Sequence, residues 1–228
     1  MDKEHYFRVL YPLQDRVIGI LSGVETGFYL TGGTAASRGY LNHRFSDDLD
    51  FFVNDDARFV LWAERLIQSL SRVPGWRLDV TQKEERFVRV GIRDGETLLK
   101  VEMINDEPAR SGEIREHPVL GRLDSPENIL ANKVSALLDR GEPKDLADIW
   151  GFCCRMRLSL DDAIRGAQSK AAGVFPADLG RALCSATSSD WELIRWIEAP
   201  DVERFKADLD RLGESLILGH PWIPTPHA

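Results

Sequence analysis

Two aspartates inside an apolar run are the residues whose type and spacing point most directly to chemistry. Residues 48–53 read DLDFFV, and such alternation is typical of a strand with one buried face. Asp48 and Asp50 then share the face opposite Leu49 and Phe51, with Cα atoms about 6.6 Å apart. Because a buried carboxylate pair is costly without counter-charge, the pattern predicts one or two divalent cations. Mg²⁺ fits best, since it takes few carboxylate ligands and completes its shell with water and phosphate oxygens.

A third carboxylate and a glycine turn extend this pattern. In the run KVEMI, Glu102 lies on the polar face of another predicted strand. Upstream, Gly32, Gly33 and Thr34 separate a short predicted strand from a helical run at 35–41. Glycines there let backbone N–H groups approach an anion, the helix N-terminus adds partial positive charge, and Thr34 can cap the helix and contact a phosphate. Together, the turn and the carboxylates predict a nucleotide held by its phosphates against metal ions.

The elements that must position these residues follow from the spacing of apolar residues. Alternation predicts strands at 27–30, 48–53, 76–81, 86–92 and 97–104. Helical spacing predicts helices at 6–21, 58–70, 126–139, 143–155, 159–171, 177–186 and 201–212. We therefore expect an α+β fold, with a mixed sheet and helices over residues 1–123 and a helical domain over residues 124–228. The proline-rich stretch HPWIPTPHA is expected to be surface coil or a docked arm.

Composition excludes several classes of protein. The chain has 228 residues, 43% of them apolar and 29% charged, and no apolar run approaches the roughly 20 residues of a membrane helix. The first residues lack the apolar core of a signal peptide, so we expect a cytoplasmic location without membrane contact. Cys153, Cys154 and Cys184 form no C-x-x-C pair and are expected to be reduced packing residues. A net charge of −8 argues against a broadly basic surface for nucleic acid.

Two stretches of the sequence resemble a known family. GGTAASRGYLNHRFSDDLDFF, residues 32–52, is similar to the signature of the AbiEii/AbiGii toxin family of nucleotidyltransferases, within the DNA polymerase beta-like superfamily. The positions that match are Gly32, Gly33, Thr34, Ala35, His43, Arg44, Ser46, Asp48, Leu49, Asp50, Phe51 and Phe52. Asn42 departs from the pattern, where a glycine commonly precedes the histidine. SPENILANKVSALLDRGEPKDLADIW resembles the family's later motif at Lys133, Arg140, Lys144, Asp145 and Asp148.

The resemblance implies a polymerase beta-like fold and a two-metal nucleotidyl transfer. Asp48, Asp50 and Glu102 would bind Mg²⁺, or Mn²⁺ in its place, while an acceptor hydroxyl attacks the α-phosphorus of a nucleoside triphosphate and pyrophosphate leaves. Lys133 completes the implied catalytic set, because it lies on the apolar flank of its helix and in this family faces the nucleotide phosphates. The residues implied to bind the nucleotide are Gly32, Gly33, Thr34, Arg44, Ser46, Lys133 and Asp145.

Structural roles compete with binding roles for several charged residues. Lys133, Lys144, Asp145 and Asp148 could form salt bridges that join two helices. Lys144 and Asp148 stand at i and i+4, the spacing of a helical ion pair. Asp145 is favoured as a structural residue that pairs with Lys133 or Arg140.

The same question arises for four other basic residues. His43 and Arg44 could brace their loop instead of touching substrate, and bracing is favoured for His43. Arg86 and Arg89 lie on a predicted strand and could reach a triphosphate, although a solvated face is the default for such residues.

Three functions are compatible with these observations. The favoured one is the toxin of a bacterial toxin–antitoxin or phage-defence (abortive infection) pair, which transfers a nucleoside monophosphate to RNA such as a tRNA end and has a cognate antitoxin. The second is the same transfer to a small-molecule or protein hydroxyl, which the acidic net charge favours because RNA binding needs a basic surface. The third is a non-catalytic nucleotide-binding module, and the intact Asp48, Asp50 and Glu102 weigh against it.

Overall fold

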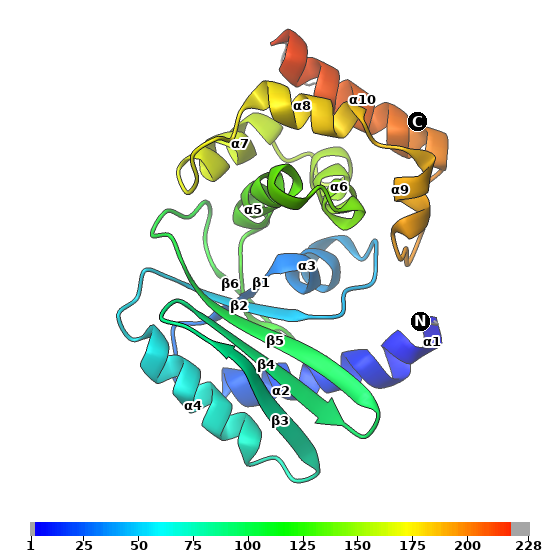
Figure 1. The fold of residues 1–228 in the computed structure, drawn as a ribbon. Coiled ribbons are helices and arrows are strands. Elements are labelled where there is room, and N and C mark those ends of the chain that lie inside the picture. The colour runs from blue at the N-terminus through cyan, green and yellow to red at the C-terminus, as the bar shows by residue number, and fades with distance from the viewer. Residues whose placement is uncertain (1–2, 220–228) are drawn as a thin grey trace. The chain divides into compact units, whose positions relative to one another are not determined.

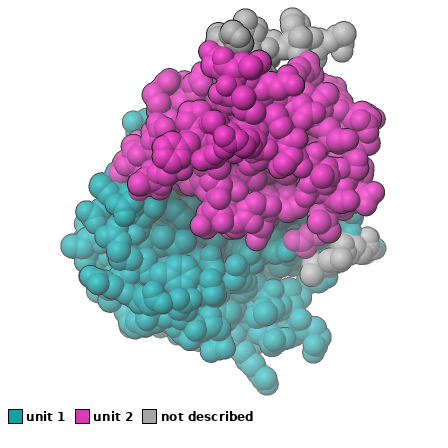
Figure 2. All heavy atoms as spheres, turned by 45° about the horizontal axis from the view of Figure 1, so that its top comes forward, with its two compact units in different colours: residues 1–35, 45–108, 113–125 teal, residues 36–44, 109–112, 126–228 magenta. Residues whose placement is uncertain are grey.

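The computed structural model of the chain describes residues 3–219 (Figure 1). The stretch HPWIPTPHA, for which surface coil or a docked arm is expected, lies outside these residues. The chain divides into two compact units (Figure 2), of which unit 1 comprises residues 1–35, 45–108 and 113–125, and unit 2 comprises residues 36–44, 109–112 and 126–228. A partition into a catalytic core, residues 1–123, and a helical domain, residues 124–228, stays a prediction about function.

Within the described residues, unit 1 contains a seven-stranded sheet with the strand order β3-β4-β5-β2-β1-β7-β6. The strands are β1 (Tyr29–Thr31), β2 (Leu49–Asn54), β3 (Trp76–Lys83), β4 (Phe87–Asp94), β5 (Thr97–Asp106), β6 (Arg115–His117) and β7 (Gly121–Leu123). β2 pairs with β5, and β1 with β7, in parallel, whereas the other neighbours are antiparallel. The sheet is therefore mixed, as predicted, and β6 and β7 are strands that the apolar pattern does not reveal.

Two helices cover one face of this sheet (Figure 1). The first is formed by α1 (Lys3–His5), η1 (Tyr6–Leu10, a π-helical segment) and α2 (Tyr11–Ser22), and it confirms the helix predicted at 6–21. The second, α4 (Phe59–Ser71), contacts α2. The sheet contributes to this core the buried side chains of Leu49, Phe51, Val53, Val90, Val101 and Met103. Because strand side chains alternate, the polar residues of β2 and β5 lie on the opposite face.

Unit 2 is helical in the part that the structure describes. After the strands end, its helices are α5 (Pro126–Arg140), α6 (Pro143–Trp150), η3 (Gly151–Arg155), α7 (Leu160–Gln168), α8 (Pro176–Cys184), α9 (Ser188–Leu193) and α10 (Val202–Leu218). The predicted helices are confirmed, and α6 and η3 together form the one predicted at 143–155. No helix within residues 3–219 combines the length and the apolar composition needed to span a bilayer.

The helix α10 runs past its predicted end at Leu212. Gly213 lies within it and packs against Gly180 of α8, where a Cβ on Gly180 would lie 2.8 Å from the Gly213 carbonyl oxygen. The two glycines therefore allow a close helix crossing, and Gly213 is a packing residue instead of a helix stop.

The cysteines are packing residues, as predicted. Cys153, Cys154 and Cys184 are free thiols, and the first two are buried. Burial raises the pKa of Cys154 to about 12 and the pKa of Cys153 well above its usual value. Both thiols are therefore protonated at neutral pH and poorly nucleophilic.

Candidate active site

The strand register of unit 1 places charged residues in one row across the sheet. Thr31 of β1 pairs with Asp50 of β2, Asp50 pairs with Glu102 of β5, and Glu102 pairs with Arg89 of β4. Asp48 directly precedes β2. The alternation predicted for both acidic strands is confirmed, because the neighbours of Asp50 and Glu102 along each strand are buried while these two are half-buried. Two of the three predicted metal ligands are thus direct cross-strand neighbours.

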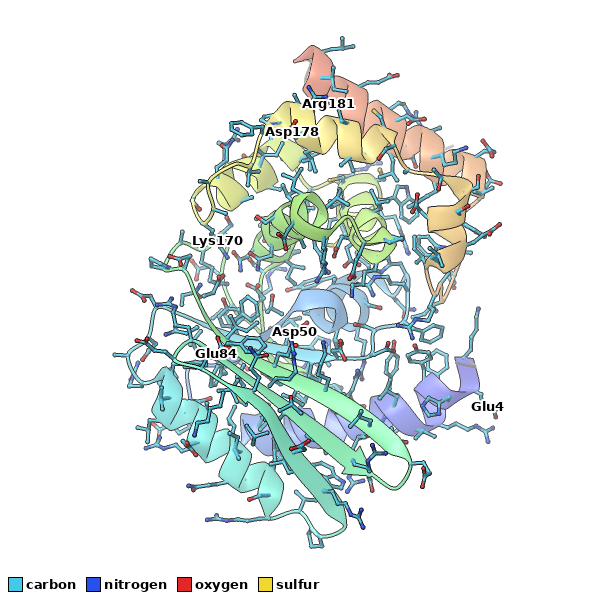
Figure 3. The ribbon with its side chains drawn as sticks, viewed as in Figure 1. Glu4, Asp50, Glu84, Lys170, Asp178 and Arg181 are labelled. Atoms are coloured by element: carbon cyan, nitrogen blue, oxygen red, sulfur yellow. The ribbon has the colours of Figure 1, made fainter. Side chains whose placement is uncertain are left out.

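The Gly-Gly-Thr turn is packed against the same acidic strand. Gly32 has φ +66°, a conformation that favours glycine. A Cβ at Gly32 would collide with the carboxylate of Asp50, whose Cγ would lie 2.9 Å away, and Asp50 projects from β2 towards this part of the unit (Figure 3). The hydroxyl of Thr34, in α3 (Gly32–Thr34), donates to the backbone carbonyl of Asp48. The helical run predicted at 35–41 follows as η2 (Ala35–Leu41), so the helix already begins at Gly32 and the Gly-Gly-Thr residues form its first turn. The capping role predicted for Thr34 is wrong, because Thr31 is the N-cap residue and Thr34 lies inside the helix.

Lys100 joins two of the carboxylates. Its Nζ lies 2.9 Å from Asp48 Oδ2 and 3.3 Å from Glu102 Oε1. Arg89 Nε lies 2.7 Å from the same Glu102 oxygen, and its side chain is 41% exposed, so the default of a solvated face is not contradicted for Arg89. It holds for Arg86, which is half-exposed and pairs with Asp55 at 2.8 Å.

These contacts favour the charged forms of Lys100 and Glu102. Burial disfavours the ammonium of Lys100, but the hydrogen bond to Asp48 and the charges of Asp48 and Glu102 outweigh burial and raise the pKa of Lys100. Burial likewise disfavours ionised Glu102, but the hydrogen bond from Arg89 and the charge of Lys100 lower its pKa. Lys100 and Glu102 therefore stabilise each other in their charged forms.

The donor chemistry of the row fits Mg²⁺. Asp48, Asp50 and Glu102 offer carboxylate oxygens, the ligands that this ion prefers, and the ammonium of Lys100 already lies as a cation between Asp48 and Glu102. Within residues 3–219, however, no three acidic, histidine or cysteine side chains are gathered closely enough to hold a metal ion. The three-ligand metal centre stays a prediction.

In unit 2, a buried ion cluster surrounds Asp148. Its carboxylate accepts hydrogen bonds from Arg44 Nε at 2.7 Å and Nη2 at 2.6 Å, and Lys133 Nζ lies 2.7 Å from Oδ2. His43 Nε2 lies 2.9 Å from Oδ1. Burial opposes ionisation of Asp148, but the charges of Arg44 and Lys133 hold its pKa well below the usual value. His43 therefore has the bracing position favoured for it, and Arg44 shares that position.

Asp145 is the second carboxylate of this cluster. Its Oδ1 lies 2.9 Å from Lys133 Nζ, and Arg140 donates from Nε and Nη2 at 2.8 and 3.0 Å. The structural pairing favoured for Asp145 is present with both predicted partners. Burial opposes ionisation of Asp145, but the charge of Lys133 and the hydrogen bond from Arg140 outweigh it and lower its pKa.

The ion pair considered between Lys144 and Asp148 is not formed. Lys144 Nζ instead lies 2.6 Å from Glu142 Oε2, with both side chains nearly half-exposed, whereas Asp148 is fully buried. The i, i+4 spacing brings two residues to neighbouring places on a helix, but here α6 turns Asp148 into the core and leaves Lys144 at the surface.

Sequence reasoning missed one buried acid. Asp124, which directly follows β7, is 0% exposed and accepts a hydrogen bond from the Thr31 hydroxyl at 2.7 Å. Its backbone N–H donates to the carbonyl of Leu30. Asp124 therefore fixes the end of β1 directly before the glycine turn. An acid preceding the Ser-Pro pair that begins α5 is the signal that could have indicated it.

Ser46 and Gly33 are the remaining residues that the resemblance implies as nucleotide contacts. Ser46 is buried, and its backbone carbonyl accepts from Gln14 Nε2 at 3.1 Å. Gly33 lies in the turn, next to Gly32. The nucleotide-binding roles of these residues, and of Thr34, Arg44, Lys133 and Asp145, stay predictions.

The mixed sheet, its glycine turn and its three carboxylates define a protein of the nucleotidyltransferase class. The model of the family described as nucleotidyl transferase AbiEii toxin, of type IV toxin–antitoxin systems, matches residues 19–153. The chain belongs to this family, and the resemblance seen in its motifs is confirmed.

One known protein is similar to the chain in sequence, and others are similar in fold. An uncharacterized protein of Aquifex aeolicus is 31% identical over 129 residues, which are 56% of this chain and 58% of that relative. The structure of JHP933 from Helicobacter pylori has a TM-score of 0.66 at 20% identity and covers 96% of this chain and 94% of its own. MenT4, a nucleotidyltransferase toxin from Mycobacterium tuberculosis, has a TM-score of 0.64 at 20% identity and covers 91% and 82%. These likenesses confirm the predicted α+β nucleotidyltransferase fold.

Proposed function

We propose that this protein transfers a nucleoside monophosphate from a nucleoside triphosphate to an acceptor hydroxyl. It would act in the cytoplasm as the toxin of a toxin–antitoxin or phage-defence pair, with a cognate antitoxin and with RNA, such as a tRNA end, as acceptor. The observation that carries the proposal is the cross-strand pair Asp50 and Glu102, with Asp48 beside it and Gly32 closing over Asp50. Family membership supports the nucleotidyl transfer itself.

Each side chain has a role in this proposal. Asp48, Asp50 and Glu102 would hold two Mg²⁺ ions, which when bound neutralise charge on the entering and leaving oxygens. The backbone N–H groups at Gly32 and Gly33 would approach the phosphates. The acceptor hydroxyl oxygen would bond to the α-phosphorus as the bond to pyrophosphate breaks, and its proton would pass to solvent, while the protein contributes mainly position and charge.

Lys133 would bind a phosphate oxygen with one of its N–H groups. An ammonium has three N–H donors, and the contacts to Asp145 and Asp148 account for two. Arg44 and Asp145, implied to bind the nucleotide, would act by fixing Lys133, since both belong to the buried cluster around it.

The second candidate is transfer to a small-molecule or protein hydroxyl, and the net charge of −8 favours it. A non-catalytic module is disfavoured by the three intact carboxylates. The deciding experiment incubates the protein with each labelled nucleoside triphosphate, Mg²⁺ and total RNA, and then separates RNA, protein and small molecules. Label in RNA supports the toxin proposal, and label in another fraction favours the second candidate. Equal label with wild type and Asp50→Asn would overturn the transferase proposal.

A further inference from the structure

Lys100 occupies the place between two predicted metal ligands. It lies on the same face of β5 as Glu102, two residues before it, and its ammonium touches both Asp48 and Glu102. A divalent cation shared by these two carboxylates would occupy the space between them, where the ammonium lies. An ammonium and a metal ion that both lay between Asp48 and Glu102 would repel each other strongly, so the presence of one disfavours the other.

We propose that Lys100 is a positioning residue, an internal counter-ion that competes with divalent metal for Asp48 and Glu102. The free protein then binds metal weakly, and metal binds well only when a triphosphate supplies the negative charge that draws the ammonium away. This inference rests on the proposed function, because it concerns the same carboxylates. It adds an order of binding in which metal and nucleotide enter together.

The surroundings of Lys100 allow its side chain to move. The ammonium is carried on a flexible four-carbon stem, and the side chain is 38% exposed. The residue opposite it on β4 is Gly91, which leaves that part of the face without a side chain. A Cβ on Gly91 would meet its nearest neighbour at an ordinary 3.5 Å, and its φ is not in the left-handed region. The fold therefore does not require glycine there, and the space lies beside the lysine.

Arg89 does not have this role. It contacts Glu102 alone of the acidic residues in the row, across the strand pair, whereas Lys100 bridges Glu102 to Asp48. A metal ion on Asp48 and Glu102 can leave Arg89 in place on one Glu102 oxygen, but it must displace Lys100.

The test measures Mn²⁺ binding to the full chain without nucleotide, by the electron paramagnetic resonance signal of free Mn²⁺. Lys100→Met keeps the length of the side chain and removes the charge, and it should bind Mn²⁺ about tenfold more tightly than wild type. Lys100→Arg retains the charge and should bind weakly, as wild type does. Lys83→Met is the matched control, because Lys83 lies on the same sheet but pairs with Glu64 and should leave the affinity unchanged.

The outcomes are distinct. The inference is overturned if Lys100→Met binds Mn²⁺ no more tightly than Lys83→Met does. The proposed function can still hold in that case, provided that wild type binds Mn²⁺ with triphosphate and Asp50→Asn does not. If no variant binds Mn²⁺ in an Asp50-dependent way, with or without triphosphate, both the inference and the proposed function fail. Circular dichroism establishes the folded fraction, and Lys100→Gln replaces Lys100→Met if the latter does not fold.

Discussion

At the scale of single residues, the carboxylates of unit 1 differ in what surrounds them. Lys100 contacts both Asp48 and Glu102, and Arg89 contacts Glu102. The carboxylate of Asp50 lies close to Gly32. Neighbouring Asp47 accepts a hydrogen bond from the Tyr6 hydroxyl at 2.6 Å and so takes part in packing. Adjacent acids in one sequence run can therefore be assigned different roles.

Asp48→Asn and Asp50→Asn should each abolish nucleotidyl transfer, by at least about a hundredfold, and leave the protein folded. Asparagine keeps the shape and one acceptor oxygen but removes the charge needed to hold a metal ion beside phosphates. Asp47→Asn is the control, since an amide oxygen can still accept from Tyr6, and it should retain most activity. Transfer rates with labelled triphosphate decide the matter. Equal losses for all three variants would contradict the assignment of faces on β2.

His43 should make the free energy of unfolding depend on pH below neutrality. Burial lowers its pKa beneath 6.5, outweighing the hydrogen bond and charge of Asp148, and the charges of Arg44 and Arg155 lower it further. Nδ1 of His43 is buried without a hydrogen-bond partner among the described residues. The unfolded chain therefore binds a proton on His43 near pH 6.5, whereas the folded chain binds it only at lower pH. The free energy of unfolding therefore falls as the pH falls from 6.5 towards the pKa of His43 in the folded protein.

Urea denaturation between pH 7.5 and 5 measures this loss, which is at most about 1.4 kcal/mol per pH unit for one group. His43→Gln should flatten the dependence over that range. His5→Gln leaves the Asp148 cluster intact and should retain it. A wild-type stability that is constant or rises on acidification would show that His43 is not held neutral.

At the scale of elements, the glycines of α8 and α10 determine how closely these helices cross. A Cβ on Gly213 would lie 2.5 Å from the Gly180 carbonyl oxygen and would also collide with Cys184. Because the first of these atoms is backbone, a side chain there must push the helices apart. The helices α8 and α10 can therefore lie this close because neither Gly180 nor Gly213 has a Cβ atom.

Gly213→Ala should destabilise the protein by about 1–3 kcal/mol, although the same change inside an exposed helix usually stabilises it by up to about 1 kcal/mol. Gly19→Ala in α2 is the matched control, since a Cβ there would meet nothing within 4 Å. The two variants should therefore move the urea midpoint in opposite directions. A stabilised Gly213→Ala would mean that the crossing is looser than described.

Elements could be predicted where the apolar pattern was long. The longer helices and the four longer strands, β2 to β5, follow from their periodicity, whereas β6, β7 and α9 are too short to show one. The row from Thr31 to Arg89 depends on strand order and register, which one sequence does not specify. The contact of Lys100 with Asp48 depends further on a side-chain conformation. The acidic face could thus be predicted, whereas its cationic partners could not.

At the scale of the whole molecule, ligand binding must change the free energy of unfolding. A ligand that binds only the native state raises the free energy of unfolding, by about 2.7 kcal/mol at a hundred times its dissociation constant. Any coupling between metal and triphosphate then appears as a difference between the shift with both and the shifts with each alone. This readout requires no knowledge of the acceptor.

A nucleoside triphosphate with Mg²⁺ should raise the melting temperature by about 5–10 °C at saturating concentration, from the stabilisation above and about 2–4 °C per kcal/mol for a chain of this size. Triphosphate with a chelator should give a much smaller shift, because the carboxylates of Asp48, Asp50 and Glu102 then repel the phosphates. Asp50→Asn should lose the metal-dependent part, and Lys133→Ala should reduce it while remaining folded, since Arg44 and Arg140 still compensate Asp148 and Asp145. Differential scanning calorimetry measures these shifts for wild type with Mg²⁺, wild type with chelator, Asp50→Asn and Lys133→Ala. A wild-type shift that is the same with chelator as with Mg²⁺ would contradict metal-assisted binding, whereas an undiminished shift in Lys133→Ala would confine this lysine to the buried ion cluster.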